Sequence, residues 1–283
     1  MYAWLTTIMY GLGSVVGKIA TKHHIANPWL YNFIFFVLTA ICIIPFAVAG
    51  GVGWPQDWSS ILWLSIANAV SGTMFVLAFY AVDLSILSPL SSLRTPLVAL
   101  SGVLFLGERL TILQWALIGT IFIAGGFVNL DERMNIRTVL NKKITLGLLW
   151  ILCSAWFNST IKYASAKNGF WEVSLWPSVL ATILVLPTLP LFYRDLIHTR
   201  ISRYHGLTIS TILFTAGLLF SVKALGENVS ISMAIISLPL SMLITMALSF
   251  IAPKLLEKHT NVVYAVRLVA ATVMFLAALG LSK

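Results

Sequence analysis

The stretch Pro89-Leu90-Ser91-Ser92-Leu93-Arg94-Thr95 has a counterpart in the second half of the chain, Pro239-Leu240-Ser241-Met242-Leu243-Ile244-Thr245. Each copy lies within a long apolar run, and a short charged segment follows each run: Gly107-Glu108-Arg109-Leu110-Thr111 in the first half and Leu256-Glu257-Lys258-His259-Thr260 in the second. A second register, which pairs Pro96 with Pro239, also fits. In either register, similarity at corresponding positions indicates a duplicated fold.

Apolar runs of about 20 residues, the length of a helix that crosses a lipid bilayer, account for most of the chain. The sequence has 283 residues, of which 59% are hydrophobic and 10% charged, and its mean hydropathy is +0.94. This composition excludes a soluble globular protein. The ten runs lie near 3–21, 29–49, 60–81, 86–106, 112–130, 144–165, 172–192, 207–226, 231–252 and 261–281.

A charged connector over residues 131–143 divides the chain into two five-helix repeats, 1–130 and 144–283. Because each repeat has an odd number of spans, the second enters the membrane from the opposite side. The sequence therefore predicts an all-α membrane protein with ten transmembrane helices arranged as an inverted 5+5 repeat. This architecture is typical of secondary transporters.

The segment from Pro96 to Leu130, with its charged segment 107–111, Gln114-Trp115, Gly119 and Gly125-Gly126, resembles the end of an EamA-type half-unit of the drug/metabolite transporter superfamily. The first run, with Tyr10-Gly11 and Lys18, is also similar to the first helix of that family. The resemblance implies a carrier whose first, third, fourth, sixth, eighth and ninth helices surround a central cavity. The helices over 112–130 and 261–281 are then packed at its side, in a monomer or a weak homodimer formed through these two helices.

Charged side chains within the apolar runs are the most informative candidates, because an ionisable group at mid-bilayer costs about 2.5–3.5 kcal/mol. Arg94 lies about eight residues into its run, and no Asp or Glu lies three or four positions from it. Its partner is therefore an anionic substrate, another helix, or the carbonyls that Pro96 frees. Lys18 and Lys162 lie near helix ends, where their ammonium groups can reach the membrane surface.

Polar and aromatic residues near the middle of the runs complete the predicted substrate-binding set, although each could instead bond to a neighbouring helix. With Arg94, this set comprises Tyr10, Ser14, Asn68, Ser71, Trp156, Asn158, Ser237 and Ser241. An alternative is an aromatic cage for a quaternary amine, built around Trp156 and Tyr10.

Residues at helix ends are candidates for gating, capping or close packing. Asp83, Glu227 and Lys223 are candidates for gating or coupling, with solvated turns as the alternative for the two acids. Glu108 and Glu257 are predicted to cap the helices that follow them. Glycines that allow close helix packing complete the set: Gly13, Gly17, Gly119, Gly125 and Gly126.

The function predicted from these features is secondary active transport of small polar or amphipathic metabolites by alternating access, with a preference for anionic or zwitterionic substrates. The alternatives are a non-transporting structural or sensory subunit and a quaternary-amine carrier. No catalytic pair lies within the runs, and the two separate cysteines, Cys42 and Cys153, provide no metal set, so we expect no enzyme activity, metal or cofactor.

Basic residues are concentrated in the connections between the runs. The formal charge of +9 therefore relates to membrane topology, and the expected partners are substrate and lipid rather than nucleic acid. The odd-numbered connections hold most of these residues, which predicts a multi-pass protein of the cell membrane with those connections in the cytoplasm.

Overall fold

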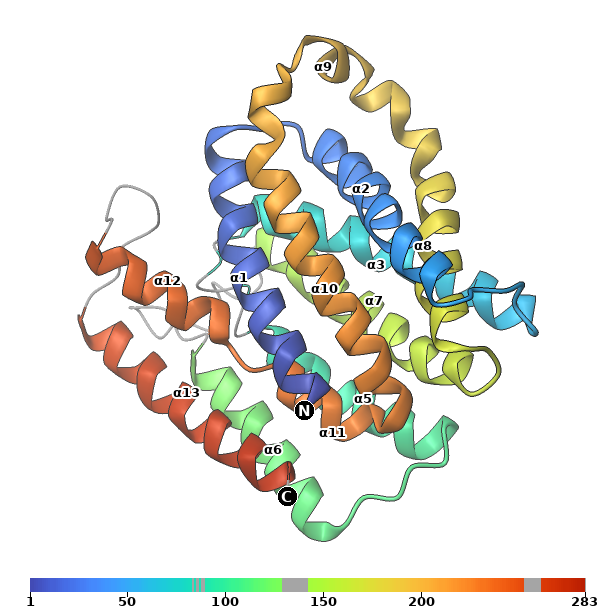
Figure 1. The fold of residues 1–283 in the computed structure, drawn as a ribbon. Helices are drawn as coiled ribbons and strands as arrows, with labels where there is room; N and C mark the ends of the chain where they lie inside the picture. The colour runs from blue at the N-terminus through green and yellow to red at the C-terminus, as the bar shows by residue number, and fades with distance from the viewer. Residues whose placement is uncertain (83, 85–86, 88–89, 129–141, 252–260, 283) are drawn as a thin grey trace.

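The structure is a computed structural model that describes residues 1–82, 84, 87, 90–128, 142–251 and 261–282. All the regular elements in these residues are helical (Figure 1). In chain order they are α1 (Tyr2–His23), α2 (Pro28–Ala49), α3 (Trp58–Ala81), η1 (Ser91–Leu93), α5 (Arg94–Phe105), α6 (Ile112–Val128), α7 (Lys142–Ser165), α8 (Phe170–Val185), η3 (Leu186–Leu191), α9 (Tyr193–His198), η4 (Ile201–Tyr204), α10 (His205–Glu227), α11 (Val229–Ile236), α12 (Leu240–Ile251) and α13 (Asn261–Leu281).

Five helical stretches in the described residues are long and apolar enough to cross a membrane: Pro28–Ala49, Trp58–Ala81, Phe170–Leu191, Ile201–Glu227 and Val229–Leu248. Three shorter apolar helices are Ser91–Phe105, Ile112–Phe127 and Ala265–Leu281. The predicted all-helical fold class is therefore confirmed. Its division into ten spans with inverted halves stays a prediction.

Two of the expected continuous helices are interrupted next to the repeated Pro-Leu-Ser motif. In the run 231–252, α11 ends at Ile236 and α12 begins at Leu240, with Pro239 between them. In the run 86–106, the 3-10 turn η1 precedes α5. Proline has no N–H to donate to the preceding turn, and its ring crowds that turn. Pro239 is the last residue of the α11–α12 break, and Pro96 follows η1, so each interruption lies in the turn before a proline.

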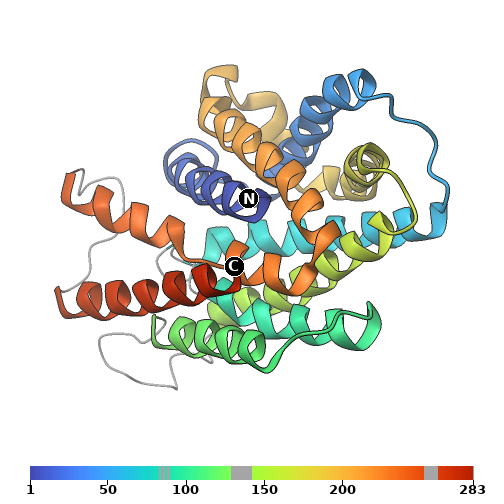
Figure 2. The same ribbon diagram turned by 60° about the horizontal axis from the view of Figure 1, so that its bottom comes forward.

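The longest interfaces join helices that are distant in sequence, with α1 on α10 and α3 on α7. Small residues allow this approach: a Cβ at Gly217 of α10 would lie 2.5 Å from the Tyr10 ring, and one at Gly17 of α1 would lie 2.6 Å from the Ser210 hydroxyl. Helices α6 and α13 pack together at one edge of the molecule, as Figures 1 and 2 show.

The predicted close-packing glycines differ in their surroundings. Gly13, Gly17 and Gly125 each lie against a side chain of another element, Phe214, Ser210 and Ser92 respectively. Gly119 and Gly126 have open space where a Cβ would be, so the close-packing prediction is wrong for these two. Both lie on α6, which has contacts with α13 along only part of its surface.

Two lysines in the helical bundle cap the ends of neighbouring helices. Lys18 is buried, and its Nζ donates to the carbonyls of Phe79 (2.6 Å) and Val82 (2.7 Å) at the end of α3. Lys162 donates to two carbonyls at the end of α10, those of Gly226 and Glu227, at 2.6 Å each. The expectation that the ammonium group extends to the membrane surface is therefore wrong for buried Lys18, and it stays a prediction for the partly exposed Lys162. Unsatisfied carbonyls and the helix dipole attract both cations.

Glu108 also caps a different helix from the one expected. Its carboxylate accepts hydrogen bonds from the backbone N–H groups of Val229 (2.6 Å) and Ser230 (3.1 Å) at the start of α11. Gly107 has a positive φ of 71°, and this turn places Glu108 on the opposite half of the chain. The helix that follows, α6, is capped by reciprocal bonds between Thr111 and Gln114. Glu257 lies outside the described residues.

Candidate functional site: a central cavity

A cavity lies at mid-depth between α1, α2, α3, α7, α10 and the interrupted helices, with about 1140 Å³ of empty space including the part open to solvent. Helices α1, α2, α3, α7 and α10 contribute residues from near their midpoints: for example, α1 contributes residues 7–14 and α10 residues 214–218. Substrate sites of carriers built from repeats commonly lie at this depth. The polar lining residues are Thr7, Tyr10, Ser14, Thr39, Asn68, Ser71, Ser91, Arg94, Ser154, Asn158 and Ser241.

Arg94 is the charged side chain among the described lining residues. It begins α5, directly after the 3-10 turn η1, so the interruption positions it at the cavity wall. Its Nη1 donates to the Ser154 hydroxyl at 2.5 Å, and its guanidinium carbon lies 5.3 Å from the centre of the Trp150 ring. Its Nε has no hydrogen-bond partner, and within the described residues it makes no ion pair. A guanidinium in this state can bind a carboxylate or phosphate.

Seven of the nine predicted substrate-binding residues line this cavity: Tyr10, Ser14, Asn68, Ser71, Arg94, Asn158 and Ser241. Tyr10 and Asn68 also bond to neighbouring helices, as the alternative interpretation expected: the Tyr10 hydroxyl donates to Ser221 at 3.3 Å and the Asn68 amide to the Pro177 carbonyl at 3.4 Å. The Asn158 amide donates within its own helix, to the Ser154 carbonyl at 2.6 Å. These bonds set the orientation of the polar groups in the wall.

The other two predicted binding residues lie outside the cavity lining. Trp156 is 37% exposed on the outer surface of α7, with its ring edge-on to Trp63. Ser237 is fully buried in the break between α11 and α12, where its backbone carbonyl accepts a bond from Ser91 at 3.5 Å. Pro89 lies outside the described residues.

Apart from Tyr10, the aromatic part of the wall was not predicted from the sequence. Phe35, Phe75, Trp150 and Phe214 line the cavity from four helices. Phe214 packs 5.6 Å from each of Phe35, Phe75 and Tyr10 in ring-centre distance. Aromatic residues are common on lipid-facing and buried helix surfaces alike, so the sequence contains no signal that separates these four. The predicted cage around Trp156 is therefore replaced by a wall around Phe214.

The predicted gating residues that the structure describes lie away from the cavity lining. The Lys223 Nζ lies 5.2 Å from the centre of the Tyr2 ring and 5.3 Å from that of Phe170. Glu227 provides the backbone carbonyl that Lys162 caps. Asp83 lies outside the described residues. Among the residues that the structure describes, no group of three or more His, Cys, Asp or Glu is placed to hold a metal ion.

Comparison with known proteins relates the chain to membrane transporters. The pattern of the EamA-like transporter family matches residues 1–130. An "Uncharacterized transporter in cobO 3'region" of Sinorhizobium sp is 34% identical over 132 residues, which cover 44% of this chain and 90% of that protein. A crystal structure of another protein has the same fold, with a TM-score of 0.68 over 99% of both chains at 16% identity. The apolar helices and these matches identify a multi-pass integral membrane transporter, and the chain belongs to the EamA-like transporter family.

Proposed function

We propose that the chain is a secondary carrier that binds small amphipathic anions or zwitterions at Arg94 and exposes the central cavity alternately to the two sides of the membrane. The observation that carries this proposal is the environment of Arg94. Its cation faces a mid-depth cavity whose described lining includes no carboxylate, and its described contacts are a neutral hydroxyl and an aromatic ring.

The cavity chemistry supports an anionic group attached to an apolar body. Arg94 and the hydroxyls around it offer donors for an anionic group, while Phe35, Phe75 and Phe214 offer an apolar surface. A free cation about 6 Å from Arg94 is repelled by about 3 kcal/mol at an effective dielectric constant of 20. This repulsion argues against a quaternary amine, even though aromatic rings surround the space.

Corresponding contacts in the two halves support the inverted repeat. The first, third, sixth and eighth spans are α1, α3, α7 and α10. If α1 is exchanged with α7 and α3 with α10, the α1–α10 interface becomes the α7–α3 interface, and these are the two longest interfaces. The same exchange converts the Lys18 cap on α3 into the Lys162 cap on α10. The α6–α13 pair corresponds to itself.

The interrupted helices support a moving cavity wall. Non-helical backbone at membrane depth is tolerated where protein or a water-filled cavity surrounds it. Ser91 and Ser241, which follow the two repeated prolines, both line the cavity, and Leu238 lies in the break itself. In transporters, breaks of this kind form substrate sites between repeats that move relative to one another.

The proposal is tested in two steps, on purified protein and in proteoliposomes. A thermal-shift screen of anionic, zwitterionic and cationic metabolites first identifies a ligand. A ligand that binds only the folded state adds about 2.7 kcal/mol at a hundredfold excess over its Kd. Flux of that ligand is then measured per folded molecule for Arg94→Lys, Arg94→Ala and, as a control, Arg109→Ala, which removes an exposed arginine outside the cavity.

We expect Arg94→Lys to retain part of the flux, because it keeps the charge without the bidentate geometry. Arg94→Ala should abolish flux of an anionic ligand, and Arg109→Ala should leave it unchanged. Unchanged flux per molecule in Arg94→Ala would eliminate the anion site and favour the aromatic wall as a cation site. Folded protein that binds a metabolite without carrying it would instead favour the sensory subunit.

A further inference from the structure

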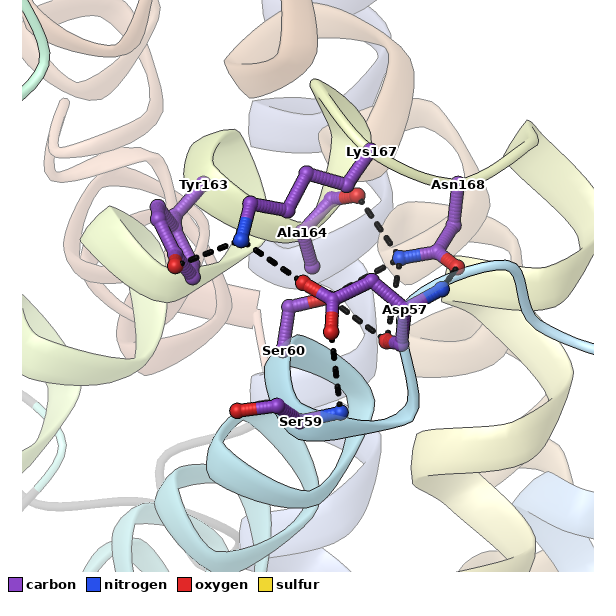
Figure 3. A network of polar contacts seen from close by, with 7 residues as sticks. All are labelled: Asp57, Ser59, Ser60, Tyr163, Ala164, Lys167 and Asn168. Carbon is purple, nitrogen blue, oxygen red and sulfur yellow. Dashed lines mark hydrogen bonds and ion pairs between the residues drawn. The ribbon is translucent and has the colours of Figure 1, made fainter.

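A polar cluster joins the two halves of the chain at the end of the molecule where α2 and α7 end and α3 and α8 begin, here called the Asp57 end. Lys167 donates to the Asp57 carboxylate at 2.7 Å, which is the ion pair formed within the described residues (Figure 3). It also donates to the Tyr163 hydroxyl at 2.7 Å. Asp57 precedes α3 and caps it through the Ser59 N–H, whereas Lys167 follows α7. The ion pair therefore links the start of one helix to the end of another.

Asn168, Glu172 and Trp176 extend this link. The Asn168 side chain accepts from the Asp57 N–H at 3.0 Å and donates to Ser60 at 2.9 Å (Figure 3). Glu172 accepts from the Gly53 N–H at 2.9 Å. Trp176 donates to the Gly53 carbonyl at 3.0 Å, and its ring stacks on that of Trp54, with centroids 5.0 Å apart. The 50–57 connection is thus held to the start of α8 at several points.

A related contact occurs at the opposite end, where α1 ends and α2 begins, here called the Asn27 end. Asn27 donates to the Asp195 carboxylate at 2.5 Å and to the Leu191 carbonyl at 3.2 Å, again joining the two halves. When the first and second spans are exchanged with the sixth and seventh, the α1–α2 turn, which holds Asn27, corresponds to the α7–α8 turn, which holds Asn168. The connection after η3 then corresponds to the 50–57 connection. Both ends therefore use an asparagine from the turn between two helices to hold the connection of the other half.

The two ends differ in charge. At the Asp57 end, Lys167 adds an ion pair, with side chains 41% and 26% exposed for Lys167 and Asp57. At the Asn27 end, no ion pair forms within the residues that the structure describes. We infer that Asp57 and Lys167 are gating residues of the transport cycle, which favour closure of the cavity at the Asp57 end and separate when it opens there. This inference rests on the alternating-access part of the proposed function.

The strength of the pair fits a gate rather than a permanent lock. In the inferred gate, opening at this end moves the 50–57 connection away from the start of α8 and breaks the Asp57–Lys167 contact. Because both side chains are partly exposed, water replaces the lost interaction at little cost, and a surface ion pair changes an equilibrium by roughly two- to fivefold. The gate therefore biases the two states without preventing their exchange.

The test measures access to the cavity without any substrate. In a variant with Cys42 and Cys153 replaced by alanine, a single cysteine is placed at Leu218, an apolar residue of the cavity lining. A membrane-impermeant thiol reagent is then added to oriented proteoliposomes from one side or the other. A cysteine at the exposed Gln56 identifies the Asp57 end. The gate variants are Asp57→Asn, which keeps a side chain able to cap α3, Lys167→Gln, and the two together.

We expect each single variant to raise the labelling rate from the Asp57 end by roughly two- to fivefold, and the double variant to match the singles, because both remove the same interaction. The control Lys22→Gln, which removes an exposed lysine at the Asn27 end, should leave the rate unchanged. An unchanged rate in the gate variants, or effects that multiply in the double variant, would overturn the gate. Labelling from one end only, in every variant, would overturn both the gate and alternating access. Loss of the Arg94 anion site alone would leave the labelling rates unaffected, so the two proposals fail in different ways.

Discussion

Replacement of Glu108 by glutamine tests whether a carboxylate from the first half of the chain holds the interrupted helix of the second. The Glu108 carboxylate accepts from the N–H groups of Val229 and Ser230 and from the Ser230 hydroxyl at 2.5 Å, all at the N-terminus of α11. Hydrogen bonds to a charged group contribute about 1.5–3 kcal/mol each, and an anion at a helix N-terminus adds about 0.3–1 kcal/mol. Glutamine keeps one carbonyl acceptor, so we expect a net loss of about 2 kcal/mol.

The assay is thermal unfolding of the purified protein in detergent. A loss of about 2 kcal/mol corresponds to a fall in Tm of about 4–8 °C for a chain of this size class. The matched control is Arg109→Gln, because the neighbouring Arg109 is exposed and makes no side-chain hydrogen bond or ion pair within the described residues. Equal Tm values for Glu108→Gln, Arg109→Gln and the unchanged protein would refute the assignment of Glu108 as the cap of α11.

Two further predictions concern packing and pH. Gly17→Ala should lower stability by about 1–3 kcal/mol, because its Cβ would lie 2.6 Å from the Ser210 hydroxyl. Gly119→Ala, which has open space at that position, should be neutral or stabilising. Equal Tm values for the two variants would contradict this packing. Lys167 lowers the pKa of Asp57 below its usual 3.8, and the hydrogen bond to Asp57 raises the pKa of Lys167 above 10.5. The ion pair is therefore present between the pKa of Asp57 and the pKa of Lys167. It is lost as pH falls through the folded pKa of Asp57 and as pH rises through the folded pKa of Lys167. The effect of Asp57→Asn on the labelling rate should therefore be constant from about pH 5.5 to 8.5.

The helical fold follows from the lengths of the apolar runs, but the interruptions do not. Apolar length predicts a helix wherever about 20 residues can cross the membrane. Pro239 interrupts the run 231–252, whereas Pro45 and Pro177 lie inside α2 and α8 without ending them. Neighbouring helices and polar side chains can satisfy the carbonyl that a proline frees, so the effect of each proline depends on tertiary contacts that a single sequence does not contain.

The difference between features fixed by the local sequence and features fixed by tertiary contacts also explains which site residues could be predicted. Arg94, Asn68 and Asn158 stand out because a polar group within a span needs a partner or water. Trp156 was chosen by the same reasoning, but an indole can also lie on the outer surface of a helix, where Trp156 lies against Trp63. The cavity aromatics Phe35, Phe75, Trp150 and Phe214 differ from Trp156 only in which side of their helix faces the centre, and helix rotation is set by packing.

The position of Arg94 and the position of the helix breaks have one physical cause. A guanidinium at mid-depth needs acceptors around it, and a continuous apolar helix provides none, because its carbonyls are bonded within the helix. The turn η1 and the α11–α12 break bring Ser91 and the Ser237 carbonyl together, and Arg94, the residue after η1, bonds to Ser154. The interruption that weakens each helix thus creates the polar surface that makes a buried cation tolerable. In the proposed carrier, an anionic substrate would complete that surface, and its release would leave Arg94 with Ser154 and water as partners, so the proposal requires a hydrated cavity whenever it is empty.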